Sequence, residues 1–138
     1  MRMNLLVVDE MPVTMQRVLY EAMHLGDDDP LVLRIEAVHS EDQAMQFVMN
    51  ATVDCVVISF AGGAQDQLEL INRISCHGCA VAVLTSETIT PALANLARDY
   101  GADMLLPRSL QKHPLEKGVL RAWLVQHARR EESKENIV

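Results

Sequence analysis

Apolar segments alternate with helical patterns along most of this chain. Each of five short aliphatic runs is followed by a segment whose apolar residues recur about every 3.6 positions. The predicted strands are Met3–Val8, Leu31–Val38, Val53–Ser59, Ala80–Leu84 and Met104–Leu106, and the predicted helices lie between Pro12 and Gly26, Ser40 and Ala51, Leu68 and Ile74, Thr90 and Tyr100, and His113 and Arg130. This alternation predicts right-handed crossovers and a parallel α/β sheet with helices on both faces.

The composition is that of one domain. With 138 residues, of which 49% are hydrophobic, the chain is long enough for one core and too short for two ordinary domains. We expect residues 1–127 to form this domain. The sequence RREESKENIV at Arg129–Val138 is charged and lacks core-forming positions, so residues 128–138 are predicted to be a tail or the start of a linker.

Charge and targeting signals limit the partners and the location. A formal net charge of −7 disfavours binding to nucleic acid, because proteins that bind phosphate backbones usually present a basic face. No apolar run approaches the ~20 residues that span a bilayer, and Met1–Glu10 lacks the features of a signal peptide. We therefore expect a cytoplasmic protein without membrane contact, whose three cysteines are reduced.

Polar residues mark the points at which the predicted strands end. They are Asp9 and Glu10 after the first strand, Ser59 at the end of the third, Thr85 and Ser86 after the fourth, and Arg108 after the fifth. In open parallel sheets, ligands bind beyond the carboxyl ends of the strands. The functional crevice is therefore expected among these side chains.

Four segments carry a resemblance to a known family. They are LLVVDE at Leu5–Glu10, VDCVVIS at Val53–Ser59, LTS at Leu84–Ser86 and GADMLLPRS at Gly101–Ser109. In this order, and over Met3–Gln126, the chain resembles the receiver domain of two-component response regulators. The resemblance implies a flavodoxin-like, doubly wound fold with strand order 2-1-3-4-5, and a role in phosphorelay signal transduction rather than in enzymatic catalysis.

The resemblance also assigns roles to the strand-end residues. In receiver domains an acidic pair holds Mg²⁺, an aspartate accepts the phosphoryl group, and a hydroxyl residue and a lysine contact the phosphoryl oxygens. The matching positions here are Asp9 and Glu10 for the acidic pair, Ser59 for the acceptor, Thr85 for the hydroxyl, Arg108 for the lysine, Ser109 for the proline that follows it and Leu105 for an aromatic switch residue. The acceptor, the lysine, the proline and the aromatic residue are thus all replaced.

These replacements remove the phosphorylation chemistry that the family performs. The hydroxyl of Ser59 is neutral and has no histidine base at a strand end, so we expect a structural role for it. Mg²⁺ binding at Asp9 and Glu10 is expected to be weak or absent, because the serine supplies no negative ligand, and no cofactor is required. Arg108 carries a planar, permanent charge that suits a pair with Asp9 or Glu10. We hypothesise that this pair replaces metal and phosphate and fixes the pocket in one conformation.

Three functions remain open at this point. The leading interpretation is a pseudo-receiver, a regulatory module that acts through protein contacts without phosphorylation. A second is a working receiver phosphorylated at Ser59, Asp54 or Asp66, although Asp54 opens its strand and lies at the wrong end of it. A third is a small-ligand module that uses the same crevice, although Gly62-Gly63 is the only glycine-rich turn.

The resemblance further indicates where partners bind. In the family, contacts usually involve the fourth helix, the fifth strand and the fifth helix, which correspond here to Thr90–Tyr100, Met104–Leu106 and His113–His127. The expected occupants of this surface are a second copy of the chain, a separate protein or a fused output domain.

A C-x-x-C motif, Cys76-His77-Gly78-Cys79, lies away from the strand ends. Zinc requires four ligands and no second pair follows, so ordinary loop cysteines are favoured over a metal half-site or a reversible disulfide. The motif is therefore given no role in the crevice.

Overall fold

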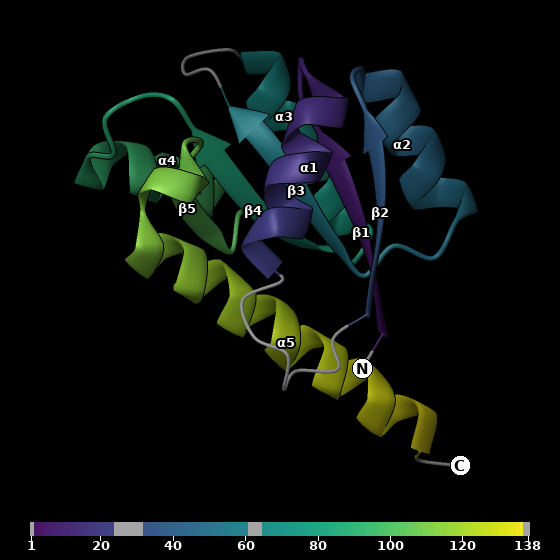
Figure 1. The fold of residues 1–138 in the computed structure, drawn as a ribbon. Coiled ribbons are helices and arrows are strands. Elements are labelled where there is room, and N and C mark those ends of the chain that lie inside the picture. Colours follow the sequence, from purple (N-terminus) through teal and green to yellow (C-terminus); the bar gives the residue numbers. More distant parts are fainter. Residues whose placement is uncertain (1, 24–31, 61–64, 137–138) are drawn as a thin grey trace.

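A computed structural model describes residues 2–23, 32–60 and 65–136 of the chain (Figure 1). Within these ranges the chain forms one sheet flanked by helices. The strands are β1 (Arg2–Val8), β2 (Val32–Val38), β3 (Cys55–Phe60), β4 (Ala80–Thr85) and β5 (Met104–Pro107). The helices are α1 (Pro12–Met23), α2 (Glu41–Asn50), α3 (Gln65–Cys76), α4 (Pro91–Asp99) and α5 (Pro114–Asn136), with a short 3-10 turn η1 (Leu110–Lys112) before α5.

All neighbouring strands are parallel, in the order β2-β1-β3-β4-β5. The predicted five-stranded, doubly wound sheet is therefore confirmed. Parallel pairing brings the carboxyl ends of the strands to one edge, where Val8 pairs with Ile58 and Ser59 pairs with Leu84. The residues that end or follow β1, β3, β4 and β5 consequently lie close together.

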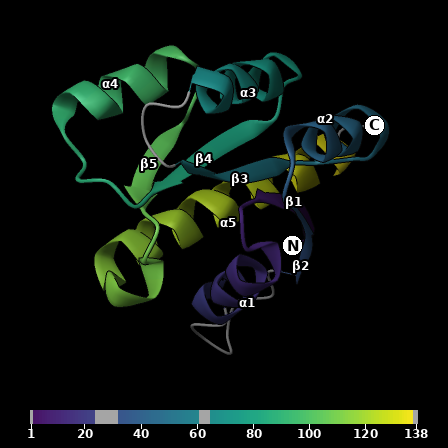
Figure 2. The same cartoon turned by 90° about the horizontal axis from the view of Figure 1, so that it is seen from above.

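Helices cover both faces of the sheet (Figure 2): α1 and α5 lie on one face, and α2, α3 and α4 lie on the other. Side chains alternate along each strand, so Leu5 and Val7 pack toward α1 and α5, whereas Leu6 and Val8 pack toward the other three helices. Burial on both faces explains why the strand sequences are continuous apolar runs.

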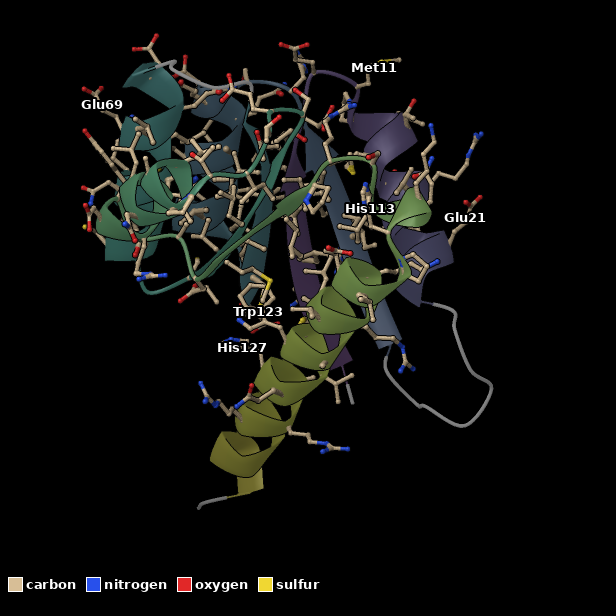
Figure 3. All side chains as sticks on the ribbon, turned by 90° about the vertical axis from the view of Figure 1, so that its left-hand side faces the viewer. Met11, Glu21, Glu69, His113, Trp123 and His127 are labelled. Atoms are coloured by element: carbon tan, nitrogen blue, oxygen red, sulfur yellow. The ribbon has the colours of Figure 1, made fainter. Side chains whose placement is uncertain are left out.

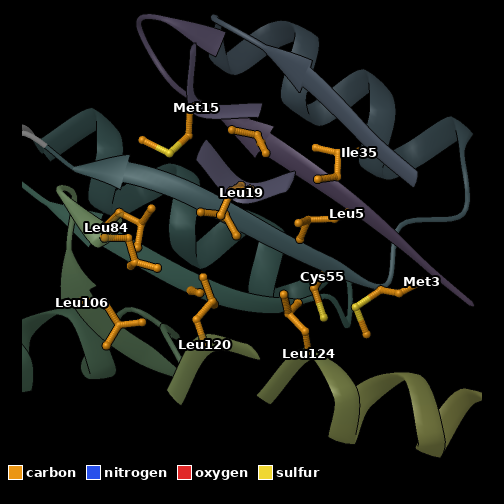
Figure 4. Close-up of a cluster of buried hydrophobic side chains, with 14 of the residues drawn as sticks. Met3, Leu5, Met15, Leu19, Ile35, Cys55, Leu84, Leu106, Leu120 and Leu124 are labelled. Atoms are coloured by element: carbon orange, nitrogen blue, oxygen red, sulfur yellow. The ribbon is translucent and has the colours of Figure 1, made fainter. Parts of the chain in front are cut away.

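The core between the sheet and the pair α1 and α5 is shown in Figure 4. Leu19, Leu84 and Leu120 are fully buried there, and they come from α1, β4 and α5. Aromatic residues make up 4% of the sequence, so flexible thioethers help to fill this space: Met3 and Met15 are both buried in the same cluster.

Polar residues and glycine fix several helix ends. Ser40 and Thr90 are the N-cap residues of α2 and α4, and each hydroxyl accepts a hydrogen bond from the amide three positions further on. Gly101, just after α4, has a φ of 110°, and a Cβ at this position would lie 2.6 Å from the side chain of Ser75 in α3. Both the backbone conformation and the close approach to α3 therefore require glycine here.

Helix α5 is longer than the sequence pattern predicted. It continues through Asn136 instead of ending near Arg130, and Ala128 is still fully buried. Residues 129–136 contain neither glycine nor proline and are rich in Arg, Glu and Lys, which favour helix as much as they suit a solvated tail. The domain boundary after residue 127 stays a prediction.

Figure 3 shows that α5 extends beyond the sheet and that the labelled Trp123 and His127 lie side by side on it. Their ring centroids are 4.8 Å apart in an edge-on arrangement, and Trp123 packs partly against the core beneath α5.

Two predicted features lie outside the described residues: the end of the first helix at Gly26 with the loop that follows it, and the Gly62-Gly63 turn. Among the residues that are described, no helix is both long enough and apolar enough to cross a membrane.

Candidate functional site

Residues from four strand ends meet at the carboxyl edge of the sheet. Asp9 follows β1, Ser59 lies in β3, Thr85 ends β4 and Arg108 follows β5. Asp9 and Thr85 are buried, while Ser59 and Arg108 are half-buried. A polar cluster at this edge matches the position at which open parallel sheets bind ligands.

Asp9 is the centre of the hydrogen bonds in this cluster. Its Oδ1 accepts from the backbone amide of Met11 at 2.7 Å and from Nη2 of Arg108 at 2.9 Å. Its Oδ2 accepts from the hydroxyl of Ser59 and from Nε of Arg108 at 3.3 Å. Each oxygen thus has two donors, so the buried carboxylate is fully satisfied by the protein itself.

Arg108 is positioned by its backbone as well as by its side chain. Its amide donates to the carbonyl of Thr85 at 2.7 Å, which ties the residue to the end of β4. Its guanidinium grips both oxygens of Asp9 with two nitrogens, a geometry that a lysine ammonium cannot reproduce. The side chain is 38% exposed, whereas that of Asp9 has no exposed surface. Arg108 therefore neutralises a fully buried acid from the rim of the site.

The arrangement shifts the pKa of both partners. Burial by itself raises the pKa of Asp9, but the hydrogen bonds from Arg108, Ser59 and the Met11 amide, together with the charge of Arg108, bring this pKa below its ordinary value. The hydrogen bond to Asp9 likewise raises the pKa of Arg108. Both groups are therefore charged at neutral pH.

The lowered pKa of Asp9 predicts a loss of stability in acid. Ionised Asp9 stabilises the fold fully above the ordinary carboxyl pKa of about 3.9, and this contribution is lost as the pH falls through the lower folded-state pKa. Urea unfolding of the parent and of Asp9→Asn, compared between about pH 7 and pH 3, measures it. We expect the parent to lose more stability than the variant over this interval, and equal losses would contradict the assignment.

Ser59 is occupied by structural hydrogen bonds. Its hydroxyl donates to Oδ2 of Asp9, and its carbonyl accepts from Nε2 of Gln67 at 3.5 Å. A serine nucleophile needs a base that removes its proton. Asp9 is the group that accepts this proton's hydrogen bond, but a carboxylate with a lowered pKa is a weak base.

The remaining matched residues lie around this network. The hydroxyl of Thr85 accepts from the amide of Glu87 at 3.1 Å, and Ser86 is exposed. Leu105 is half-buried and packs against the core beneath α2, α3 and α4. Leucine has no polar atom at the end of its side chain, so it cannot switch between a buried and an exposed hydrogen-bond partner.

The pocket fits a magnesium ion poorly. A cavity of about 220 Å³ is lined by Asp9, Glu10, Met11, Ser59, Gln67, Ser86 and Arg108. Mg²⁺ requires carboxylate oxygens with room for several waters in octahedral geometry. Both oxygens of Asp9 are already turned to a guanidinium, and Glu10 is exposed. Within the described ranges, no group of three or more His, Cys, Asp or Glu residues is placed to hold a metal.

Two groups of the site escaped sequence inspection. The amide of Met11 bonds to Asp9, and Gln67 of α3 lines the cavity. A backbone amide leaves no mark in the sequence other than the helix start at Pro12. Gln67 has no motif around it, and only the crossover from β3 to α3 brings it to the strand ends.

The two alternative carboxylates, Asp54 and Asp66, take no part in the hydrogen bonds of this cluster. Oδ2 of Asp54 accepts from the amide of Asn4 at 2.7 Å, next to the amino-terminal end of β3, and Asp66 is exposed on α3. Neither carboxylate is among the residues that bond to Asp9 or Arg108 in the structure described.

The C-x-x-C motif spans the end of α3 and the turn before β4. Cys76 is exposed, Cys79 is half-buried, and both thiols are free. The thiol of Cys79 donates to the carbonyl of Val53 at 3.5 Å, and burial raises its pKa. The raised pKa keeps the Cys79 thiol protonated. The bond to Val53, which precedes β3, shows that the motif lies at the opposite end of the strands from Asp9.

The fold is similar to that of solved receiver domains. A response regulator from Thermotoga maritima matches with a TM-score of 0.67 and 19% identity over 92% of this chain and 98% of that one. The signal receiver domain of an HD domain-containing protein from Pseudomonas fluorescens Pf-5 matches with a TM-score of 0.66 and 22% identity over 96% and 99%. An atypical orphan response regulator, whose structure revealed a phosphorylation-independent regulatory mechanism, matches with a TM-score of 0.61 and 17% identity over 92% and 96%.

No protein-family model matches this sequence, and no curated protein sequence does either. The structural likenesses show that the chain has the fold of the receiver domains of two-component response regulators.

Proposed function

We propose that this chain is a regulatory module with a receiver fold whose state does not depend on aspartyl phosphorylation. The observation that carries the proposal is the bidentate contact of Arg108 with Asp9, completed by the hydroxyl of Ser59. In receiver domains, the residue that matches Asp9 holds a metal ion, and the residue that matches Ser59 accepts the phosphoryl group. Here the Arg108 guanidinium bonds to Asp9 instead, and a neutral hydroxyl stands at the acceptor position.

The mode of action that follows is binding rather than catalysis. The Asp9 carboxylate of this pocket is paired with Arg108 and the Ser59 hydroxyl is only weakly activated, so we expect the module to act without Mg²⁺ or another cofactor. Its output is contact with a separate protein or a fused output domain in the cytoplasm, through the surface formed by α4, β5 and α5. Large apolar side chains are accessible on these elements, since Leu96 of α4 and Leu115 and Val119 of α5 are 39%, 83% and 51% exposed.

The atypical orphan response regulator that shares this fold supports the proposal, because its structure revealed a regulatory mechanism that is independent of phosphorylation. A phosphorelay role at Ser59, Asp54 or Asp66 is the competing function, and the following experiment separates the two.

Intact mass after incubation with Mg²⁺ and acetyl phosphate tests the proposal. We expect no phosphate adduct on the parent and an adduct on Ser59→Asp/Arg108→Lys, because the double change supplies a carboxylate acceptor and frees Asp9 from the bidentate contact. Ser59→Asp alone should be modified less than the double variant, because Arg108 still competes for the carboxylates.

The control adds Asp9→Asn to the double variant, which should abolish the adduct without restoring Arg108. Circular dichroism of each variant verifies that it is folded. An adduct on the parent would overturn the proposal, and fragmentation would then identify the modified residue.

A further inference from the structure

A second cavity adjoins the magnesium-type pocket described above. It has a volume of about 300 Å³ and lies between the first half of α1 and the segment around η1. Arg108 and Ser86 line both cavities, whereas Asp9 and Ser59 line only the first of the two. The residues that line only the second are Thr14, Met15, Val18, Ser109, Gln111 and Lys112. Arg108 is therefore part of two cavities that differ in composition.

All polar side chains of the second cavity can donate hydrogen bonds. They comprise two cations, one carboxamide and three hydroxyls, on Arg108, Lys112, Gln111, Thr14, Ser86 and Ser109. No Asp or Glu is among the described residues that line it, whereas the first cavity contains the carboxyl groups of Asp9 and Glu10. Although the chain as a whole has a net charge of −7, the composition of this cavity favours an anionic ligand.

Arg108 can contact a second anion without releasing Asp9. Its Nε and Nη2 donate to Asp9, and a guanidinium has further N–H groups on Nη1 and Nη2. Within the described residues these further groups have no hydrogen-bond partner. The contact with Asp9 and the bond from the Arg108 amide to Thr85 hold the residue in place. An anion that binds the remaining N–H groups therefore immobilises little that is not already fixed.

The η1 side of the cavity is fixed by the core. Leu110 of η1 is fully buried and belongs to the same cluster as Met15 of α1. The amide of Lys112 donates to the carbonyl of Ser109 at 3.0 Å, which closes the turn. The backbone that carries Ser109 and Lys112 is thus anchored next to α1, and the cavity does not depend on a free loop.

We propose that this cavity binds a small phosphate monoester, whose phosphate lies between Arg108 and Lys112 and whose organic group contacts Met15 and Val18. A phosphate monoester carries a charge of about −1.5 to −2 at pH 7 and has three acceptor oxygens, so it suits two cations surrounded by donors. Met15 is 3% exposed and Val18 is half-buried, and they supply the apolar part of the cavity. The volume limits the organic group to about one ring.

This inference goes beyond the proposed function, because it adds a small ligand to a module whose output is protein contact. The binding is noncovalent, and Ser59 takes no part in it because Ser59 lines the other cavity. A carboxylate carries a single charge and leaves one of the two cations unbalanced. A nucleic acid is repelled by the net charge of −7, and one cavity with two cations offers it few phosphate contacts.

Titration calorimetry of the full chain with phenyl phosphate, in a buffer without phosphate, tests the inference. We expect saturable binding at one site with a sub-millimolar dissociation constant. Benzoate has the same ring and a single negative charge, and it should bind at least about tenfold more weakly. Inorganic phosphate should also bind at least about tenfold more weakly, because it has no apolar group to place against Met15 and Val18.

Matched variants locate the ligand. Thr14 and Lys112 line only the second of the two cavities. Thr14→Asp places a carboxylate in this cavity and should weaken the binding of phenyl phosphate at least about tenfold, and Lys112→Gln removes one cation and should weaken it about tenfold. The controls are Thr52→Asp between α2 and β3 and Arg73→Gln on α3, which make the same changes of charge at exposed positions elsewhere. Both should stay within about threefold of the parent.

Three outcomes would overturn the inference: no binding of phenyl phosphate by the parent, equally tight binding of benzoate, or losses in the control variants as large as those in Thr14→Asp and Lys112→Gln. Equally tight binding of inorganic phosphate would assign the cavity to the free ion and would contradict the role of Met15 and Val18. Circular dichroism verifies that each variant is folded.

The titration and the acetyl phosphate experiment fail independently. No phosphoryl group is transferred from phenyl phosphate, so the intact mass of the chain should be unchanged after the titration. An adduct on the parent with acetyl phosphate would overturn the proposed function and leave the ligand site in place. Absence of phenyl phosphate binding would remove the ligand site and leave the proposed function in place.

Discussion

Replacement of Leu120 by alanine is expected to lower the free energy of unfolding by about 3 kcal/mol, because loss of a fully buried leucine leaves a cavity between α5 and the sheet. Leu120 belongs to the cluster that also contains Leu5, Leu19 and Leu84, and three different elements would lose contacts. Urea unfolding at neutral pH, followed by circular dichroism, measures the change.

Val119→Ala is the matched control because it alters the neighbouring residue, whose side chain lies on the exposed side of the same helix. Val119 is 51% exposed, so its truncation should change the free energy of unfolding by no more than about 0.5 kcal/mol. Similar losses for the two variants would show that α5 packs on the sheet through a different side. The pair also separates residues that hold α5 in place from those assigned to partner binding.

Arg108→Ala is expected to lower the free energy of unfolding by about 2 kcal/mol. Removing one partner of a buried ion pair typically costs about 3–5 kcal/mol, and the 38% exposure of Arg108 reduces this figure because water can partly replace the guanidinium. The variant leaves Asp9 with the Ser59 hydroxyl and the Met11 amide as donors. The uncompensated carboxylate should then accept Mg²⁺, so millimolar MgCl₂ should raise the urea midpoint of the variant and leave that of the parent unchanged.

Two control variants test whether the effects of Arg108→Ala arise from its ion pair with Asp9. Arg34→Ala breaks an ion pair with Glu36 whose side chains are 66% and 46% exposed, and it should cost no more than about 0.5 kcal/mol. Asp9→Asn/Arg108→Ala removes both charges and should recover part of the stability lost in Arg108→Ala. If Arg108→Ala altered neither stability nor the response to Mg²⁺, the role of Arg108 as the internal counter-charge would be wrong.

The sequence was sufficient for the architecture because the signals that determine it are local. Continuous apolar runs such as that before Asp9 predict strands buried on both faces, and helical spacing between them requires crossovers. Caps were also readable, since Ser40 and Thr90 are followed by helical patterns at the expected distance. The length of α5 was not readable, because a stretch of Arg, Glu and Lys is compatible with both a helix and a tail.

The site was predictable as a set of strand ends, but its bonding was not. The sequence indicated that Arg108 could pair with Asp9 or Glu10, and the structure has it on Asp9, with Glu10 exposed. The choice depends on the direction in which each side chain leaves its strand end. The contribution of Gln67 depends on where the crossover places α3, and no pattern within α3 encodes that position.

Trp123 gives the chain an internal optical reporter. It is the single tryptophan in the sequence, it lies on α5 against the core, and the ring of His127 is 4.8 Å away. Emission excited at the red edge of the protein absorption band therefore comes from this helix alone. Detachment of α5, or a ligand that moves it, would change the colour and intensity of that emission, so the helix can be followed in the unmodified protein without a label.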